Sequence, residues 1–144
     1  MSFTLGMSKF TNKTEKQLSQ IVRKTALGLF SAVMKGTPVD SGRARGAWMF
    51  SINKFDNTTP IAIRSESEAL SDIVSGVSSY KSGDTLTFSN NLDYIEVLEY
   101  GLFKWSDSAK VTNHYSSQAV GGFVRINVAI FQTYVNKAIN NRSV

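Results

Sequence analysis

Apolar residues recur with a helical period over most of the first quarter of the chain. Between residues 8 and 35 they stand three or four positions apart, with lysines and glutamine between them. The apolar positions are Leu18, Ile21, Val22, Ala26, Leu29, Phe30 and Val33. This spacing predicts a long amphipathic helix that ends at Gly36, and Pro38 prevents the helix from resuming.

Three short segments alternate apolar and polar residues with a period of two, which is typical of half-buried strands. The segments are residues 47–53, 60–64 and 85–89, and a turn at residues 82–84 precedes the last one. Their apolar positions are Trp48, Phe50 and Ile52, then Ile61 and Ile63, then Leu86 and Phe88. We expect the face of the first strand that carries the aromatic side chains to point inward.

Three further segments favour helices. Residues 66–80 have helical spacing that Gly76 and several serines weaken, and residues 92–100 form a short helix that ends at Gly101. Residues 122–140 fit both a strand and a helix at first, and their length decides for one helix. Residues 102–118 have no clear period, and a loop of that length is usually functional or disordered.

The chain's length and composition favour one domain over residues 1–144. There is no internal repeat, no second domain, and no cysteine for a disulfide or a thiolate metal site. The start lacks the pattern of a secretory signal, and no apolar run approaches the roughly 18 residues that span a bilayer. We predict an α+β fold in a reducing cytoplasm. A small antiparallel or mixed sheet packs against a long N-terminal helix and a C-terminal helix, with no cofactor and no membrane contact.

Charge is segregated along the chain, which has a net charge of +5. Counting Lys and Arg against Asp and Glu gives +6 for residues 1–45, −5 for residues 46–107 and +4 for residues 108–144. The opposite charges either pair within one monomer or form complementary edges between copies. Such edges would produce a head-to-tail interface, which closes into a ring if the rotation permits.

The first motif, residues 37–45, joins the long helix to the first predicted strand. Pro38, Asp40 and Gly42 have the properties of turn residues. Arg43 and Arg45 would share one face if the strand has already begun. They are either solvated arginines beside a turn or a pair that recognises carboxylate or phosphate.

The second motif places Asp93, Glu96 and Glu99 three residues apart near one face of the predicted short helix. The three carboxylates form a solvated acidic face, a cation site, an acid/base pair, or the partner of the Arg43 and Arg45 surface on an adjacent subunit. The third motif begins with Gly121 and Gly122 before a helix. These glycines either allow backbone donors to hold an anion or permit close packing.

The segment without a period carries aromatic residues among charges, and its members are Phe103, Trp105 and Tyr115. They either contact a partner, stack on nucleic-acid bases or fold back over the core. The one histidine, His114, lies in the same segment with no positioned acid or nucleophile beside it in sequence.

Taken as a set, these motifs resemble the small tail completion or neck proteins that join head and tail in long-tailed bacteriophages. The resemblance extends over residues 37–131 and is carried by Thr-Pro-Val-Asp-Ser-Gly-Arg and Trp48, then Asn-Asn-Leu-Asp-Tyr, Leu-Glu-Tyr-Gly and Gly-Gly-Phe-Val-Arg. Val120 stands where a proline usually precedes the double glycine, and the stretch between Gly101 and Gln118 is longer than expected.

The resemblance implies an α+β virion subunit without enzymatic activity. Such a subunit assembles in the host cytoplasm into a ring, usually taken to be sixfold, at the head-tail junction. Its partners would be further copies, the head connector or adaptor, and the tail terminator or tail tube, with genomic DNA passing through the lumen. Pro38, Asp40, Gly42, Arg43, Trp48, Tyr94, Leu98, Glu99, Tyr100, Gly101, Gly121 and Gly122 match the family pattern and look structural or interfacial.

The resemblance and the charges together give a set of expected site residues. The expected subunit or partner interface comprises Asp40, Arg43, Arg45, Asp93, Glu96, Glu99, Tyr100, Phe103, Trp105, Tyr115 and Arg125, and the expected structural turns are Pro38, Gly42, Gly101, Gly121 and Gly122. The alternative is a basic nucleic-acid-binding module, which a pI near 9.6 favours. A small hydrolase that uses His114 ranks third.

Overall fold

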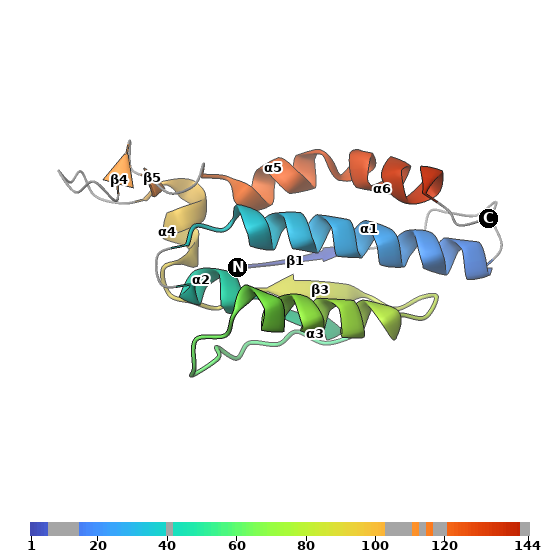
Figure 1. Cartoon of the computed structure of the whole chain (residues 1–144), viewed down its shortest axis with the longest axis horizontal. Coiled ribbons are helices and arrows are strands. Elements are labelled where there is room, and N and C mark those ends of the chain that lie inside the picture. The colour runs from blue at the N-terminus through green and yellow to red at the C-terminus, as the bar shows by residue number, and fades with distance from the viewer. Residues whose placement is uncertain (6–14, 40–41, 103–110, 113–114, 117–120, 142–144) are drawn as a thin grey trace.

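Three helical rods lie side by side, and a small sheet packs against two of them (Figure 1). The structure is a computed structural model that describes residues 1–5, 15–39, 42–102, 111–112, 115–116 and 121–141. The central rod, α1 (Glu15–Gly36), has α5 (Phe123–Ala129) and α6 (Phe131–Asn140) on one side and α3 (Glu66–Ser78) on the other. This arrangement confirms the predicted α+β class, with a long N-terminal helix, C-terminal helices and a small antiparallel sheet.

Helix α1 buries the apolar stripe that its period predicts. Its buried members include Ile21, Leu29, Phe30 and Val33, and it ends at Gly36 as predicted. The predicted start, residues 8–14, lies outside the described residues. Because α1 contacts α3, α5 and α6, it is the element around which the other helices are arranged.

The sheet is antiparallel, which decides between the two predicted alternatives. Its strands are β1 (Ser2–Leu5), β2 (Met49–Ile52) and β3 (Leu86–Ser89), and β3 lies in the centre. The register aligns Phe3, Phe88 and Phe50 across the three strands. All four residues of β3 are buried. The sequence pattern predicted β2 and β3, although β2 is shorter than residues 47–53, and it did not identify β1.

Aromatic rings join the sheet to α1. The ring of Phe88 stacks on Phe30 with centroids 4.7 Å apart and on Trp48 with centroids 4.5 Å apart. Trp48, which is 1% exposed, precedes β2, and its Nε1 donates to Thr37 Oγ1 at 2.8 Å. Thr37 Oγ1 in turn donates to the carbonyl of Val33 at 2.9 Å. The buried indole therefore has its polar atom satisfied by the end of α1.

The predicted strand at residues 60–64 is wrong. This segment has no strand pairing, and Ile61 is 98% exposed. An alternating pattern forms a strand when one of its faces can be buried, and here Ile61 and Ile63 both point to solvent. Arg64 instead attaches the segment to the backbone around α2 and β2. Its guanidinium donates hydrogen bonds to the carbonyls of Gly46 at 3.0 Å and Trp48 at 2.8 Å.

Helix α3 confirms the helix predicted at residues 66–80. It begins with a capping box in which Glu68 N donates to Ser65 Oγ at 3.1 Å and Ser65 N donates to Glu68 Oε2 at 2.7 Å. The hydrogen bond from the Ser65 backbone holds the pKa of Glu68 below its usual value. The predicted turn at residues 82–84 is also present, with Gly83 at φ 91°.

The C-terminal half differs from its prediction in two places. The short helix α4 (Ile95–Tyr100) ends before Gly101 as predicted, but the single helix expected at residues 122–140 is divided into α5 and α6. The break lies at Ile130, whose ψ of 22° departs from helical geometry. Within the segment that showed no period, β4 (Val111–Thr112) and β5 (Tyr115–Ser116) pair as an antiparallel ribbon.

The short helix α2 (Arg43–Gly46) packs its last residue closely against the backbone of Arg64. A Cβ atom built on Gly46 would stand 1.9 Å from the carbonyl oxygen of Arg64. We therefore predict that Gly46→Ala destabilises the protein by about 2 kcal/mol, the usual range for overpacking a rigid contact. Chemical denaturation followed by circular dichroism measures the change.

The matched control is Ser71→Ala, which alters an exposed position of α3. Its free energy of unfolding should stay within about 0.5 kcal/mol of the wild-type value. Equal stability of Gly46→Ala and the control would contradict the close contact between α2 and residue 64.

Candidate functional site

The three sequence motifs meet at one end of the molecule. The end of α1, helices α2 and α4, the β4–β5 ribbon and the start of α5 gather there (Figure 1). The side chain of Asn90 crosses from the second motif to the first, and its Nδ2 donates to the Ala44 carbonyl at 2.8 Å. A Cβ on Gly36 would approach Phe123 of the third motif at 3.1 Å. We call this region the motif end; it comprises residues 36–48, 90–102 and 121–126, as far as they are described.

Glu99 links the second and third motifs. Its side chain is fully buried, and its Oε2 accepts from Val124 N at 3.0 Å while its Oε1 accepts from Arg125 N at 3.0 Å. Oε1 also accepts from Arg125 Nε at 3.0 Å. The carboxylate therefore binds the first turn of α5 and is neutralised by a guanidinium of that same turn.

The start of α5 needs this carboxylate because its own cap has no side chain. Gly122 occupies the cap position at φ 82°, and the first amides of a helix have no partner within the helix. The Glu99 carbonyl accepts from Gly122 N at 2.9 Å and from Arg125 Nη2 at 2.8 Å. Glu99 thus accepts hydrogen bonds from the start of α5 with both its backbone carbonyl and its side-chain carboxylate.

Arg125 extends this network to the surface. Its guanidinium carbon lies 4.6 Å from the centre of the Tyr100 ring, and 52% of its side chain is exposed. The hydrogen bond to Glu99, followed by one to Tyr115, raises the pKa of Arg125. The cation is therefore fixed at the rim of the motif end, with its charge already partly compensated.

The glycines of the second and third motifs make room for Tyr115. A Cβ on Gly121 would lie 1.9 Å from the Tyr115 ring, and one on Gly101 would lie 2.5 Å from it. The sequence left an anion site and close packing open for Gly121 and Gly122, and close packing accounts for Gly121. Among the expected turn residues, Gly42, Gly101 and Gly122 have positive φ angles, and Pro38 is buried.

The expected acidic face of three carboxylates is wrong. Asp93 precedes α4 and is exposed, Glu96 is exposed on α4, and Glu99 is buried within the chain. Glu99 points inward because the uncapped start of α5 lies beneath it. An interface role for Asp93 and Glu96 stays a prediction, whereas the Glu99 carboxylate is occupied by its own chain.

The expected pairing of Arg43 and Arg45 on one face is also wrong. The chain forms helix α2 here and the strand begins only at Met49, so residues two apart point in different directions. Arg45 Nη1 contacts Glu66 Oε2 at 2.7 Å, and Nη2 donates to the Lys35 carbonyl at 2.7 Å. Arg45 therefore ties the end of α1 to the start of α3. The interface role of Arg43 stays a prediction.

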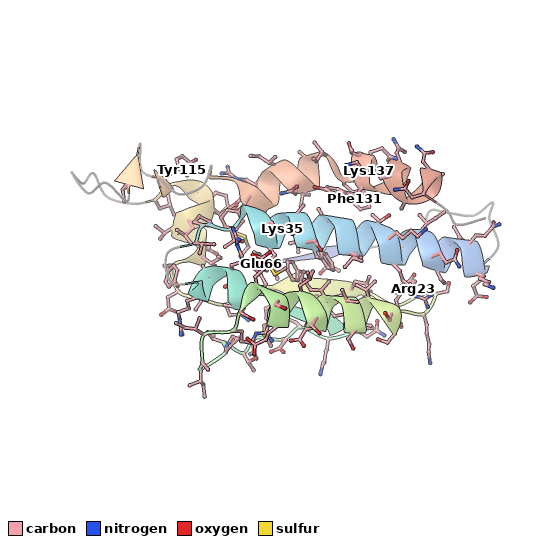
Figure 2. The ribbon with its side chains drawn as sticks, viewed as in Figure 1. Arg23, Lys35, Glu66, Tyr115, Phe131 and Lys137 are labelled. Atoms are coloured by element: carbon pink, nitrogen blue, oxygen red, sulfur yellow. The ribbon has the colours of Figure 1, made fainter. Side chains whose placement is uncertain are left out.

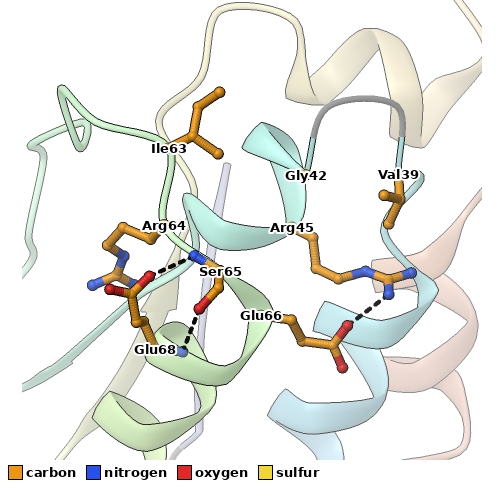
Figure 3. A pocket seen from close by; sticks show the side chains of 8 residues that line it. All are labelled: Val39, Gly42, Arg45, Ile63, Arg64, Ser65, Glu66 and Glu68. Carbon is orange, nitrogen blue, oxygen red and sulfur yellow. Dashed lines mark hydrogen bonds and ion pairs between the residues drawn. The ribbon is translucent and has the colours of Figure 1, made fainter.

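A surface hollow of about 420 Å³ lies beside the first motif. Its lining is Val39, Gly42, Arg45, Ile63, Arg64, Ser65, Glu66 and Glu68 (Figure 3). The Arg45–Glu66 ion pair and the Ser65–Glu68 capping box form its charged walls. The arginines and carboxylates among the described lining residues already bind each other or the backbone.

Several expected site residues lie outside the described residues: Asp40, Phe103, Trp105 and His114. Of the aromatic residues that suggested nucleic-acid binding, Tyr115 is described, and its ring packs against the motif glycines. In the described part of the chain, no group of three or more metal-binding side chains gathers. None of the helices within the described ranges is long and apolar enough to cross a membrane.

Sequence reasoning missed three residues that position this end. Asn90 and Thr37 are fully buried and bridge separate segments, and Arg64 anchors the loop before α3. Thr37 and Asn90 stand inside the quoted motifs, next to a proline and a second asparagine. Their position inside the motifs was the signal that could have identified them. Their hydrogen-bond partners, Trp48 for Thr37 and Ala44 for Asn90, are not neighbours in the sequence.

Apolar side chains are also exposed at the motif end: Val39, Tyr94, Tyr100 and Leu102, of which Leu102 is 60% exposed. Several exposed apolar residues in one region are typical of a surface that contacts another protein.

Comparison with known proteins found no matching protein family, no similar curated protein and no similar solved structure.

We predict that Glu99→Gln destabilises the protein by about 2 kcal/mol. The amide removes the charge that pairs with Arg125 and turns an N–H donor toward backbone N–H groups that require an acceptor. Urea denaturation measures the loss. Glu96→Gln, on the exposed side of the same helix, is the matched control and should change stability by less than about 0.5 kcal/mol. Similar stabilities for both variants would contradict the capping role of Glu99.

Proposed function

We propose that this chain is a structural protein of the neck of a long-tailed bacteriophage. In this proposal it forms a ring at the head-tail junction, completes or attaches the tail, and surrounds the DNA channel. The proposal begins from the resemblance of residues 37–131 to tail completion and neck proteins. It assigns the chain no catalytic role.

The observation that carries the proposal is the meeting of all three motifs at one end. Residues of the motifs lie up to about 90 positions apart in the sequence, yet Asn90 joins the first to the second and Glu99 joins the second to the third. Both bridging side chains are fully buried. Such a network holds the end in one fixed shape, which suits repeated docking to an identical neighbour in an assembly.

The chemistry of the motif end supports a protein partner. Its exposed side chains include two tyrosines and a leucine, and Arg125 lies over the ring of one of the tyrosines, Tyr100. Aromatic residues and arginine are enriched in protein interfaces. We propose that this end contacts a neighbouring ring, either the head connector or adaptor on one side, or the tail terminator or tube on the other. Further copies of the chain complete the ring, which is sixfold if the resemblance holds.

The proposal predicts that the chain occurs in mature virions, as one ring between head and tail. Mass spectrometry of purified particles from the virus that encodes the chain, followed by cryo-electron microscopy of the neck, makes the test. A chain that is absent from the particles would overturn the proposal. Tight DNA binding by the isolated chain, with a steep dependence on salt, would favour the nucleic-acid-binding alternative instead.

A variant sharpens this test. Leu102→Asp places a charge on the motif end, so heads and tails should accumulate unjoined while the purified chain keeps its fold. Ser82→Asp, in the exposed turn before β3, is the control and should leave joining unchanged. Normal particles from Leu102→Asp would show that the motif end does not mediate attachment.

A further inference from the structure

We propose that neighbouring copies of this chain contact each other through two different flanks of the molecule. One is the α3 flank, residues 53–78, which comprises α3 and the loop before it. The other is the α5–α6 flank, residues 123–140. The inference rests on the proposed function for its premise that the partner is a second copy, and it identifies the surfaces that meet.

The two flanks lie on opposite sides of the central helix. Helix α1 contacts α3 on one side and α5 and α6 on the other. Figure 1 shows the α3 flank below α1 and the α5–α6 flank above it, and Figure 2 shows Glu66 and Lys137 on these opposite sides. A copy can therefore present one flank to each of two neighbours at the same time.

Both flanks expose apolar side chains that the chain's own core does not cover. On the α5–α6 flank these are Ile126, Val128 and Ile130, and on the α3 flank they are Phe55, Ile61, Ile63 and Val74. Ile126 and Ile130 are four residues apart, and both remain exposed although the inner side of α5 and α6 packs on α1. Clusters of exposed apolar residues on two elements indicate contact surfaces.

The charges of the two flanks are complementary. Residues 53–78 contain Lys54 and Arg64 against four acids, Asp56, Glu66, Glu68 and Asp72, for a net charge of −2. Residues 123–140 contain Arg125 and Lys137 and no acid, for a net charge of +2. Glu99 pairs with Arg125 and Arg45 pairs with Glu66 within the chain, and both partners lie outside the flanks. Counting these pairs leaves +1 on the α5–α6 flank, from Lys137, and −1 on the α3 flank, from Lys54 and Arg64 against Asp56, Glu68 and Asp72. Opposite charge on the two flanks steers them together, whereas each flank repels a copy of itself.

These observations favour a head-to-tail contact over a symmetric dimer. A two-fold dimer requires one self-complementary surface, while two different complementary surfaces generate a ring or a filament.

The same observations favour protein over nucleic acid as the partner. DNA would suit the basic α5–α6 flank, but it would leave the acidic α3 flank with its exposed isoleucines unoccupied.

Two variants that each disable one flank test the pairing. Ile126→Asp adds an acid to the basic α5–α6 flank, and Ile63→Lys adds a cation to the acidic α3 flank; both positions are exposed, so both chains should fold. Each variant alone should be monomeric by native mass spectrometry, because every contact requires one flank of each kind. An equal mixture should form a dimer that contains one copy of each variant and grows no further.

The wild-type chain and Leu102→Asp are the controls, and both should form larger oligomers, because Leu102 lies outside residues 53–78 and 123–140. The proposal is overturned if the wild-type chain stays monomeric up to its solubility limit. It is also overturned if the single variants keep the wild-type oligomer, or if the mixture forms no mixed dimer although both chains show native circular dichroism.

A cross-linking experiment gives a second, independent measurement. The chain has no cysteine, so Val74→Cys and Ala129→Cys each introduce one reactive thiol on an exposed position of one flank. A bismaleimide should join Val74→Cys to Ala129→Cys far more efficiently than it joins either variant to itself. Equal self-linking of Val74→Cys would indicate a symmetric contact and contradict the proposal.

The outcomes separate this inference from the proposed function. If the chain occurs in the virion neck but the flank variants still assemble, the function stands and the assigned surfaces are wrong. If the mixed dimer forms but the chain is absent from virions, the flank contact stands and the neck assignment is wrong.

Discussion

The carboxylate of Glu99 is the constraint on which the motif end depends. It lies fully buried between α4 and α5 and accepts hydrogen bonds from the amides of Val124 and Arg125. A buried carboxylate is costly unless it is paired and hydrogen-bonded, and here the amides and the Arg125 guanidinium supply both conditions. The position of α5, and with it the third motif, is therefore set by a side chain of the second motif.

The rest of the fold carries this arrangement. Phe88, at the centre of the sheet, stacks on Phe30 of α1 and on Trp48. Trp48 is hydrogen-bonded to Thr37, which stands just beyond α1. The aromatic core thus fixes the end of α1 and the first motif, and Arg45 extends that fixation to α3 through Glu66.

The sequence predicts the parts of this protein that depend on local periodicity. The apolar stripe of α1 and the spacing in α3 identified both helices, because these patterns act within one element. Strand β1 has four residues, as β2 and β3 do, but it was not identified, and it is defined by pairing with β3 more than 80 residues away. The alternation at Ile61 and Ile63 resembled a strand, but no buried face receives it.

The candidate site was predictable as a set of residues but not as a set of contacts. Glu99, Arg125, Gly101 and Gly121 were singled out by motif, yet nothing local indicates that Glu99 faces inward while Glu96 faces solvent. Likewise, Arg45 finds its partners Lys35 and Glu66 only after the chain has folded, since they come from other helices. Long-range partners of charged side chains are the information that a single sequence does not display.

Amide hydrogen exchange at Val124 and Arg125 tests the central claim most directly. First-turn amides of a helix exchange rapidly when they lack acceptors, since water reaches them freely. If the Glu99 carboxylate caps α5, these two amides should exchange as slowly as the amide of Ile126, which is bonded to the Gly122 carbonyl at 2.8 Å. Exchange at the rate of exposed loop amides, in a protein whose α1 amides remain protected, would contradict the account.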